Sequence, residues 1–281
     1  VVTEVTVKIL KKPQSIKALL LGFQKIEESG QCVSDIISGG IIPAGMEVMD
    51  KPLIKATDDY SKAGYPRDVD AILIVELDGT ESEVNVLIKK VEEIAKKNKA
   101  TYLRISKNDD ERLRFWSGRK VAFPAVGSIS PDYLCMDGTI PRKKLPEVLK
   151  EITRLSNKYG LRVANCFHAG DGNLHPLIMF DSNIRSELKK AEQFGADILK
   201  YCVKSGGVLT GEHGVGIEKR DLMCEMFNDE DIQQQLNIKG AFDKNSLLNP
   251  GKVYPILHRC AEGGKMHVHK DNNKFKDIPR F

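Results

Sequence analysis

The run Ala71–Leu77 constrains the fold more than any other stretch, because it is apolar at every position except Glu76. A strand with one face in water alternates apolar and polar side chains, whereas a continuous apolar run is typical of a strand covered on both faces. Residues 78–80 read Asp-Gly-Thr and predict a turn. A helix should follow, because apolar residues recur at helical spacing: Val84, Leu87, Val91 and Ile94. The chain is therefore expected to contain a central strand followed by an amphipathic helix.

The same unit occurs a second time further along the chain. After the first helix, residues 102–106 are expected to form a short strand, and two more strands are expected at 132–137 and 162–168. The helix between these two strands is predicted by its apolar residues: Leu145, Val148, Leu149, Ile152 and Leu155. Two strand–helix–strand units predict an α+β domain with helices on one face of a mostly antiparallel sheet, ferredoxin-like in outline.

The segments outside these two units follow other patterns. Residues 1–12 contain alternating apolar residues typical of a strand, and a helix is expected over about 15–30, with Gly30 at its end. A long helix is expected over about 184–204. From Asp229 a further helix should lead to Asn249-Pro-Gly-Lys252, where proline and glycine end regular structure.

The composition excludes some classes of function. The 43 basic and 39 acidic side chains nearly cancel, and no block of like charges would form a nucleic-acid or membrane-surface patch. The longest apolar stretches are too short to cross a bilayer, so at most a peripheral association with a membrane is expected. The six cysteines lie far apart with no Cys-x-x-Cys pair. This spacing favours reduced thiols and a cytoplasmic location.

Two histidines flank a glycine-rich turn in the segment His168-Ala-Gly-Asp-Gly-Asn-Leu-His175. Its Asp-Gly pair predicts a hairpin that folds the two imidazoles toward each other. Glu212 and His213 follow later between glycines, which let the backbone approach a site closely. A His, His, Glu set suits zinc and leaves a coordination position open for a substrate oxygen. The alternative is that the glycines are ordinary turn residues and the histidines share no site.

The segment 112–120 carries three arginines and the only tryptophan of the chain. One interpretation is a solvated basic helix. The other is that Arg119 points inward beside Trp116 and forms a two-pronged ion pair with a substrate carboxylate, since a guanidinium group suits that contact better than an ammonium group. Both interpretations remain open from the residues alone.

Four segments together resemble the motifs of one family, in the same order: Trp116–Arg119, His168–His175, Gly211–Gly216 and Asn249–Lys252. This is the family of FAD-linked oxidases of the vanillyl-alcohol-oxidase type, which includes D-lactate dehydrogenases and glycolate oxidases. Four further segments look most like the D subunits of glycolate oxidases: Phe115–Pro124, Ser130–Tyr133, Cys135–Arg142 and His258–Glu262. The resemblance extends over nearly the whole chain.

The resemblance implies a flavin-dependent dehydrogenase that oxidises glycolate or D-lactate to the 2-oxo acid. It also implies a divalent metal, zinc, held by His168, His175 and Glu212, with His213 as the base beside it and Arg119 on the substrate carboxylate. Such a metal lowers the pKa of the 2-hydroxyl, the imidazole accepts the proton, and the carbon-bound hydrogen leaves as hydride to FAD.

By this resemblance, the family's amino-terminal FAD-binding domain is expected to be missing from this chain. The resemblance implies that residues 1–12 are the last strand of that domain and that residues 13–220 form the cap domain, which binds the substrate. Residues 221–281 would return to the FAD domain, with Asn249 contacting the cofactor, and end in a tail. Cys135 stands where relatives that act on longer diacids carry a lysine, which favours a small substrate. The isolated chain is expected to be inactive.

Partner subunits are also implied, because glycolate oxidases combine flavin subunits with an iron–sulfur subunit. Any membrane association is expected to be made through these partners. The polar tail from His258 is expected to dock them, rather than to form a second metal site from Cys260, His267 and His269.

Two other functions are left open by the residues themselves. A zinc-dependent hydrolase is the first, because two histidines, a glutamate and a nearby base can also activate water. The second is a non-catalytic binding or assembly module that completes an active site made elsewhere. A flavin spectrum in the full-length protein would favour the dehydrogenase over both.

Overall fold

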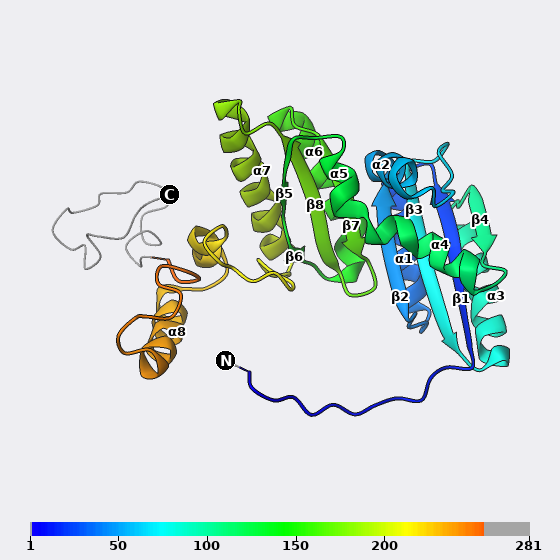
Figure 1. Ribbon diagram of the computed structural model, residues 1–281, viewed down its shortest axis with the longest axis horizontal. Helices are drawn as coiled ribbons and strands as arrows, with labels where there is room; N and C mark the ends of the chain where they lie inside the picture. Colours follow the sequence, from blue (N-terminus) through cyan, green and yellow to red (C-terminus); the bar gives the residue numbers. More distant parts are fainter. Residues whose placement is uncertain (1, 256–281) are drawn as a thin grey trace. The chain divides into compact units, whose positions relative to one another are not determined.

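The structure, a computed structural model, describes residues 2–255 of the chain. These residues fall into two compact units, the first ending at His213 and the second beginning at Gly214. The second unit contains η2 (Arg220–Glu225) and α8 (Asp229–Phe242). The first unit contains all the strands, and Figure 1 traces them along the chain.

The strands form one eight-stranded sheet in the first unit. They are β1 (Ser15–Phe23), β2 (Gly45–Asp50), β3 (Ala71–Gly79), β4 (Tyr102–Ile105), β5 (Asp132–Cys135), β6 (Gly138–Thr139), β7 (Val163–His168) and β8 (Asn173–Phe180). Their order is β4-β1-β3-β2-β7-β8-β5, with β6 paired to β8. Every pair of these strands is antiparallel, which confirms the predicted character of the sheet.

The helices of the first unit connect the strands into two similar halves. They are α1 (Ile26–Ser38), α2 (Lys51–Ser61), α3 (Glu81–Lys97), α4 (Asp109–Lys120), α5 (Ala122–Gly127), η1 (Arg142–Lys144), α6 (Leu145–Tyr159) and α7 (Arg185–Lys204). In the first half, β1-α1-β2 and β3-α3-β4 interleave their strands, which is the split arrangement of a ferredoxin-like fold. The second half runs β5-β6-α6-β7-β8-α7, and Val208 after α7 bridges to Thr139. The pairing of β2 with β7 joins the two halves.

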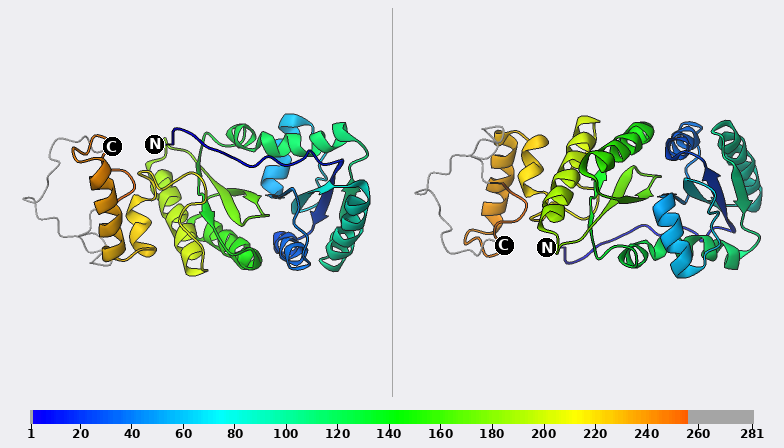
Figure 2. Two further views of the ribbon diagram at one scale, coloured as in Figure 1. Left: turned by 90° about the horizontal axis from the view of Figure 1, so that it is seen from below. Right: turned by 90° about the horizontal axis from the view of Figure 1, so that it is seen from above.

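Helices cover both faces of this sheet, which corrects the prediction that they lie on one face. Figure 2 shows α1, α3, α6 and α7 on one side and α2, α4 and α5 on the other. Ile72 and Ile74 of β3 lie in a buried cluster with Leu53 of α2 and Phe115 of α4. Leu73, between them, points to the opposite face and is also fully buried. A central strand that is apolar on both faces requires both helical layers.

Residues 15–23 form a strand, so the helix predicted over 15–30 is wrong. The apolar residues 18–21 fit either period, and pairing decides, because β1 lies between β3 and β4 and is buried there. The helix begins only at Ile26. Gly30 lies inside it rather than at its end, and a Cβ at this position would lie 3.1 Å from Leu149 Cδ1 of α6. Glycine is therefore used there for close packing of two helices.

Several further predictions can be compared with the structure. The helices expected over 184–204 and from Asp229 are confirmed as α7 and α8, whereas residues 2–12 form no regular element among the described residues. Within residues 2–255, no helix combines the length and the apolar character that crossing a membrane requires.

The cysteines depart from the prediction at one position. Those with free thiols among the described residues are Cys32, Cys135, Cys166 and Cys202. Cys224 is disulfide-bonded, so the prediction of reduced thiols is wrong for this residue. Spacing along the chain does not reveal which cysteines meet in the folded protein. The tail segment from His258, with its predicted docking role, lies outside the described residues.

Candidate active site

The hairpin between β7 and β8 carries the two predicted histidines. His168 is the last residue of β7, and His175 lies in β8. The turn requires Gly172, whose φ is +85° and whose added Cβ would lie 2.3 Å from the carbonyl oxygen of Ile140. The two imidazole rings meet edge to face with their centroids 5.1 Å apart. The prediction that the hairpin folds them toward each other is confirmed.

Asp137 holds the loop that carries Glu212 and His213. Its side chain is fully buried and accepts hydrogen bonds from the Thr210 hydroxyl at 2.6 Å and from the backbone N–H groups of Gly211 at 3.0 Å, Glu212 at 3.1 Å and His213 at 2.9 Å. Hydrogen bonds to a carboxylate are stronger than those between neutral groups. One buried carboxylate therefore anchors the backbone that presents both functional side chains.

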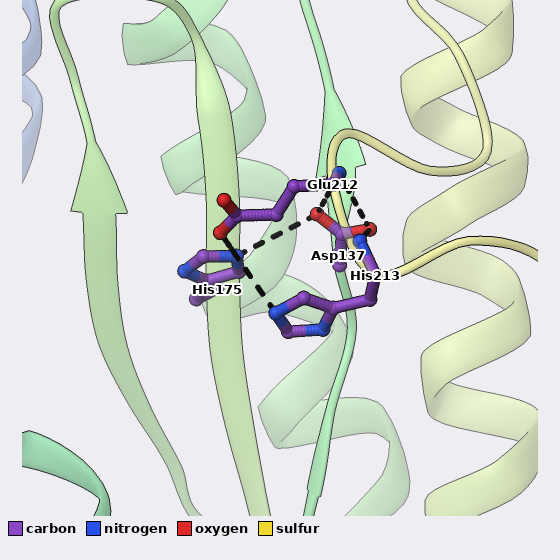
Figure 3. A group of neighbouring side chains, drawn as sticks. All are labelled: Asp137, His175, Glu212 and His213. Atoms are coloured by element: carbon purple, nitrogen blue, oxygen red, sulfur yellow. Dashed lines mark hydrogen bonds and ion pairs between the residues drawn. The ribbon is translucent and has the colours of Figure 1, made fainter. Parts of the chain in front are cut away.

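Three imidazoles converge on one oxygen of Glu212. Its Oε1 lies 3.2 Å from Nε2 of His175, 3.5 Å from Nε2 of His168 and 3.8 Å from Nε2 of His213. The rings of His175 and His213 stack with their centroids 4.8 Å apart. Figure 3 shows His175, Glu212 and His213 with Asp137, and each of these four offers a potential ligand atom within 4.8 Å of the others. The hairpin and the loop thus bring their histidines and carboxylates to one point.

His175 is buried with unused hydrogen-bonding capacity. The residue is 2% exposed, and neither ring nitrogen makes a hydrogen bond of good geometry within the described part of the chain, although Nε2 lies 3.2 Å from Glu212 Oε1 and 3.5 Å from Asp137 Oδ1. A buried polar atom without a partner costs roughly 1–3 kcal/mol, so a ligand at this ring would be stabilising. Burial, and to a smaller extent the neighbouring His168 and His213, lower the pKa of His175 to about 4. The ring is therefore neutral at pH 7, as metal coordination requires.

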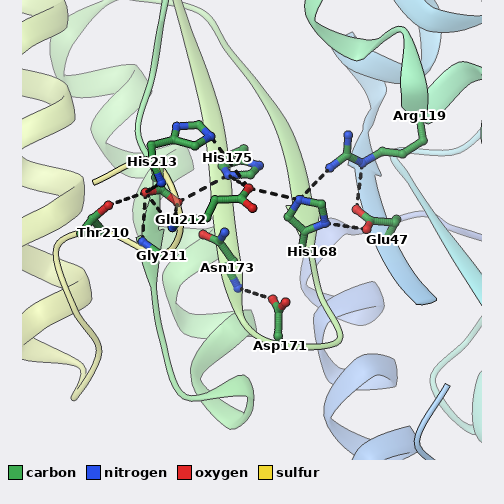
Figure 4. A network of polar contacts seen from close by, with 11 residues as sticks. Glu47, Arg119, His168, Asp171, Asn173, His175, Thr210, Gly211, Glu212 and His213 are labelled. Carbon is green, nitrogen blue, oxygen red and sulfur yellow. Dashed lines mark hydrogen bonds and ion pairs between the residues drawn. The ribbon is translucent and has the colours of Figure 1, made fainter. Parts of the chain in front are cut away.

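His168 is half-buried and belongs to a chain of interacting polar groups that also includes the more deeply buried Glu47 and Arg119, drawn in Figure 4. Glu47 Oε1 lies 2.7 Å from Nδ1 of His168, and Glu47 Oε2 accepts a hydrogen bond from Nε of Arg119 at 2.8 Å. Arg119 Nη2 lies 3.5 Å from Nε2 of His168. The hydrogen bond with Glu47 raises the pKa of His168. Glu47 thus connects a candidate metal ligand to the candidate substrate arginine.

Arg119 is turned toward the protein interior, which excludes the solvated-helix interpretation for this residue. Its side chain is only 11% exposed. It does not share its partner with Trp116, whose indole N–H donates to Glu76 at 2.7 Å together with the guanidinium of Arg112 at 2.9 Å. Arg119 therefore reaches His168, whereas Arg112 and Trp116 attach α4 to β3.

Sequence reasoning missed Glu47 and Asp137. Glu47 lies between the apolar residues Met46 and Val48 of β2, which was a usable signal, because a charged side chain in a buried strand needs a partner. Asp137 lies between β5, which ends at Cys135, and β6, which begins at Gly138. Asn249 lies in the second unit, where its side-chain oxygen accepts a hydrogen bond from Lys252 at 3.0 Å. Its predicted contact with a cofactor stays a prediction.

We expect Asp137→Ala to loosen the loop over 210–213, because four donors would lose their acceptor. The free energy of unfolding should fall by about 2–3 kcal/mol, measured by chemical denaturation, and amide hydrogen exchange at Gly211, Glu212 and His213 should accelerate. Asp171→Ala is the matched control, since Asp171 accepts one hydrogen bond, from the N–H of Asn173 at 3.0 Å. Unchanged exchange in the Asp137 variant would show that the loop has another anchor.

Comparison with known proteins agrees with this geometry. The family model described as "FAD linked oxidases, C-terminal domain" matches residues 12–253. The chain is 54% identical over its whole length to the glycolate oxidase subunit GlcD of Escherichia coli strain K12 and covers 56% of that protein. It is 35% identical to the Bacillus subtilis GlcD over 90% of this chain and 54% of that protein. The chain thus spans about half the length of these relatives.

Two solved structures share the fold at low sequence identity. p-Cresol methylhydroxylase with substrate bound superimposes with a TM-score of 0.65 at 16% identity, over 86% of this chain and 53% of that one. The 4-ethylphenol oxidase from Gulosibacter chungangensis gives a TM-score of 0.65 at 14% identity, over 88% and 55%. These likenesses establish the fold, and the family model establishes the relationship. The chain therefore belongs to the FAD linked oxidases and carries their C-terminal domain.

Proposed function

We propose that this chain is the substrate-binding part of a flavin-dependent dehydrogenase that oxidises glycolate or D-lactate to the corresponding 2-oxo acid. Two relatives are named as glycolate oxidase subunits, and a Kluyveromyces lactis protein 29% identical over 91% of this chain is named as a cytochrome-linked D-lactate dehydrogenase. The structural observation that supports the proposal is the convergence of three imidazole Nε2 atoms on Glu212 Oε1, close to a buried arginine.

His168, His175 and Glu212 would hold a divalent metal, and a set of two imidazoles and one carboxylate suits zinc. The unpartnered nitrogens of His175 favour this assignment. Asp137 is less suited, because its carboxylate already accepts hydrogen bonds from the loop over 210–213. His213 is the farthest of the three imidazoles from Glu212 and its side chain is 42% exposed, so it is available for another role.

The metal, FAD and His213 would each contribute a different part of the oxidation. A divalent cation at this site supplies a Lewis acid that lowers the pKa of the substrate 2-hydroxyl, and FAD supplies the hydride acceptor. His213 would accept the hydroxyl proton at Nε2, because its ring stacks against His175 at the edge of the site and is open to solvent. The stacking also limits rotation of the ring, which keeps its nitrogen directed at the substrate.

Arg119 would bind the substrate carboxylate. Its Nε already donates to Glu47, which leaves the two terminal nitrogens for a two-pronged contact. One of these, Nη2, lies 3.5 Å from Nε2 of His168. A 2-hydroxy acid has its carboxylate and hydroxyl on neighbouring carbons, so a small substrate fits an arginine this close to the metal ligands.

Three further points remain predictions: contact of Asn249 with FAD, an iron–sulfur partner subunit and a cytoplasmic location. The hydrolase alternative is disfavoured, because the family is one of FAD linked oxidases. The isolated chain remains expected to be inactive. It would then correspond to the non-catalytic binding module, which completes an active site made elsewhere.

The test is anaerobic mixing of the flavin-loaded protein with a hydroxy acid. Glycolate or D-lactate is expected to bleach the oxidised flavin spectrum, whereas D-2-hydroxyglutarate, a longer diacid, should do so poorly. An unchanged flavin spectrum with both small acids, in protein that contains flavin and metal, would contradict the proposed function.

A further inference from the structure

Glu47 lies where the two halves of the sheet meet. It is opposite His168 in the register of β2 and β7, although 121 residues separate the two along the chain. The residue is 7% exposed. Both carboxylate oxygens are used, one beside Nδ1 of His168 at 2.7 Å and the other accepting from Nε of Arg119 at 2.8 Å. The pairing of β2 with β7 therefore determines the surroundings of His168.

The protonation of His168 follows from this contact. A carboxylate can only accept, so its short contact with Nδ1 places the ring proton on that nitrogen. The lone pair of the neutral ring is then on Nε2, the atom that faces Glu212 at 3.5 Å. In metal sites, a carboxylate that accepts from the other ring nitrogen fixes the tautomer and the ring orientation.

We propose that Glu47 is a positioning residue that sets both the metal site and the substrate site: it fixes the tautomer of His168 and holds the guanidinium of Arg119 by Nε. This inference rests on the proposed function and deepens it. Glu47 would touch neither metal nor substrate and would act through the two residues that do.

A carboxylate is required because both neighbours donate. Glutamine at this position has one acceptor oxygen and one NH₂ group, so either His168 Nδ1–H or Arg119 Nε–H would face another donor. Glu76 provides a matched control on the neighbouring strand β3. It also accepts from an arginine of α4, Arg112, at 2.9 Å, but it contacts no histidine among the described residues. Glu76→Gln therefore removes a similar pair away from the site.

The experiment compares zinc affinity in metal-free protein by competition with a chromophoric chelator. Glu47→Gln is expected to weaken zinc binding by about 10- to 100-fold, the usual effect of losing the partner of a ligating histidine. Glu76→Gln should bind zinc as the original protein does, and His175→Ala should bind it far more weakly than either. Zinc affinity in Glu47→Gln equal to that in Glu76→Gln would overturn the inference about Glu47. Unchanged affinity in His175→Ala would instead overturn the metal site of the proposed function.

Nitrogen NMR of the imidazoles in metal-free protein at pH 8 separates positioning from a general effect on stability. The original protein should show His168 protonated at Nδ1, whereas Glu47→Gln should show a shift toward the Nε2–H form. Retention of the Nδ1–H form in the variant would contradict the proposal. Should Glu47→Gln not fold, Glu47→Asp replaces it, because aspartate keeps two acceptor oxygens on a shorter chain. It is expected to weaken zinc binding by about threefold to tenfold, and an unchanged affinity would count against the proposal.

Discussion

His175→Ala is expected to remove the bound metal and to slow flavin reduction by glycolate at least about a thousandfold, while the flavin content stays near normal. A bound metal contributes several kcal/mol of charge stabilisation in the transition state, and each 1.4 kcal/mol corresponds to about a factor of ten in rate. Because His175 is 2% exposed and its Nε2 lies 3.2 Å from Glu212 Oε1, its loss removes a buried ligand from the centre of the site. Metal analysis of the purified variant and rapid-mixing absorbance spectroscopy measure both effects.

Variants of the other residues distinguish ligands from the base. His168→Ala and Glu212→Ala should lose metal as His175→Ala does, again with normal flavin content. His213→Ala should keep the metal and still reduce its flavin about 100- to 10,000-fold more slowly, as expected for loss of a general base. If His213→Ala loses the metal while His168→Ala retains it, the ligands are instead Asp137, His175, Glu212 and His213.

Removal of the metal by a chelator provides an independent check on this prediction. The treated protein should behave like His175→Ala, and added zinc should restore flavin reduction in the original protein but not in the variant. Full activity in protein shown by analysis to lack metal would contradict the metal site and leave the histidines with another role.

The core of the fold could be predicted because its signals are local. The apolar run of β3 and the spacing of apolar residues in α3 and α6 identified the two strand–helix–strand units. The error at β1 arose because residues 18–21 are apolar at every position, a pattern that fits a buried strand and a helix equally. Only the position of β1 between β3 and β4 decides between them, and that position is a property of the assembled sheet.

The residues of the candidate site also differ in how far apart they lie along the chain. His168 and His175 are joined by one hairpin, and Glu212 and His213 are adjacent, so short-range spacing was enough to select them. Glu47 reaches the site from β2 and Asp137 from the connection between β5 and β6, and their roles depend on register and on the path of a later loop. A buried acid within a strand indicates that a partner exists, but periodicity does not identify the partner.

Arg119→Lys is expected to raise the KM for glycolate about 10- to 100-fold, which corresponds to about 1.5–3 kcal/mol for a charged hydrogen-bonded contact. The ammonium group of lysine is a single point charge, so it cannot donate to Glu47 and grip both carboxylate oxygens of the substrate as the planar guanidinium does. Initial rates of glycolate oxidation, measured over a range of glycolate concentrations, give the KM of each variant. Zinc content should be unaffected, because no metal ligand is replaced.

Arg112→Lys is the matched control for this prediction, because Arg112 lies two turns earlier on α4 and also binds a strand carboxylate, Glu76 at 2.9 Å. Its replacement should change stability slightly and leave the KM for glycolate unchanged. A similar rise in KM for both variants would mean that the effect comes from displacement of α4. An unchanged KM in Arg119→Lys would show that Arg119 only neutralises Glu47 beside His168. A higher KM confined to Arg119→Lys, with zinc bound normally, is the result that assigns the substrate carboxylate to this guanidinium.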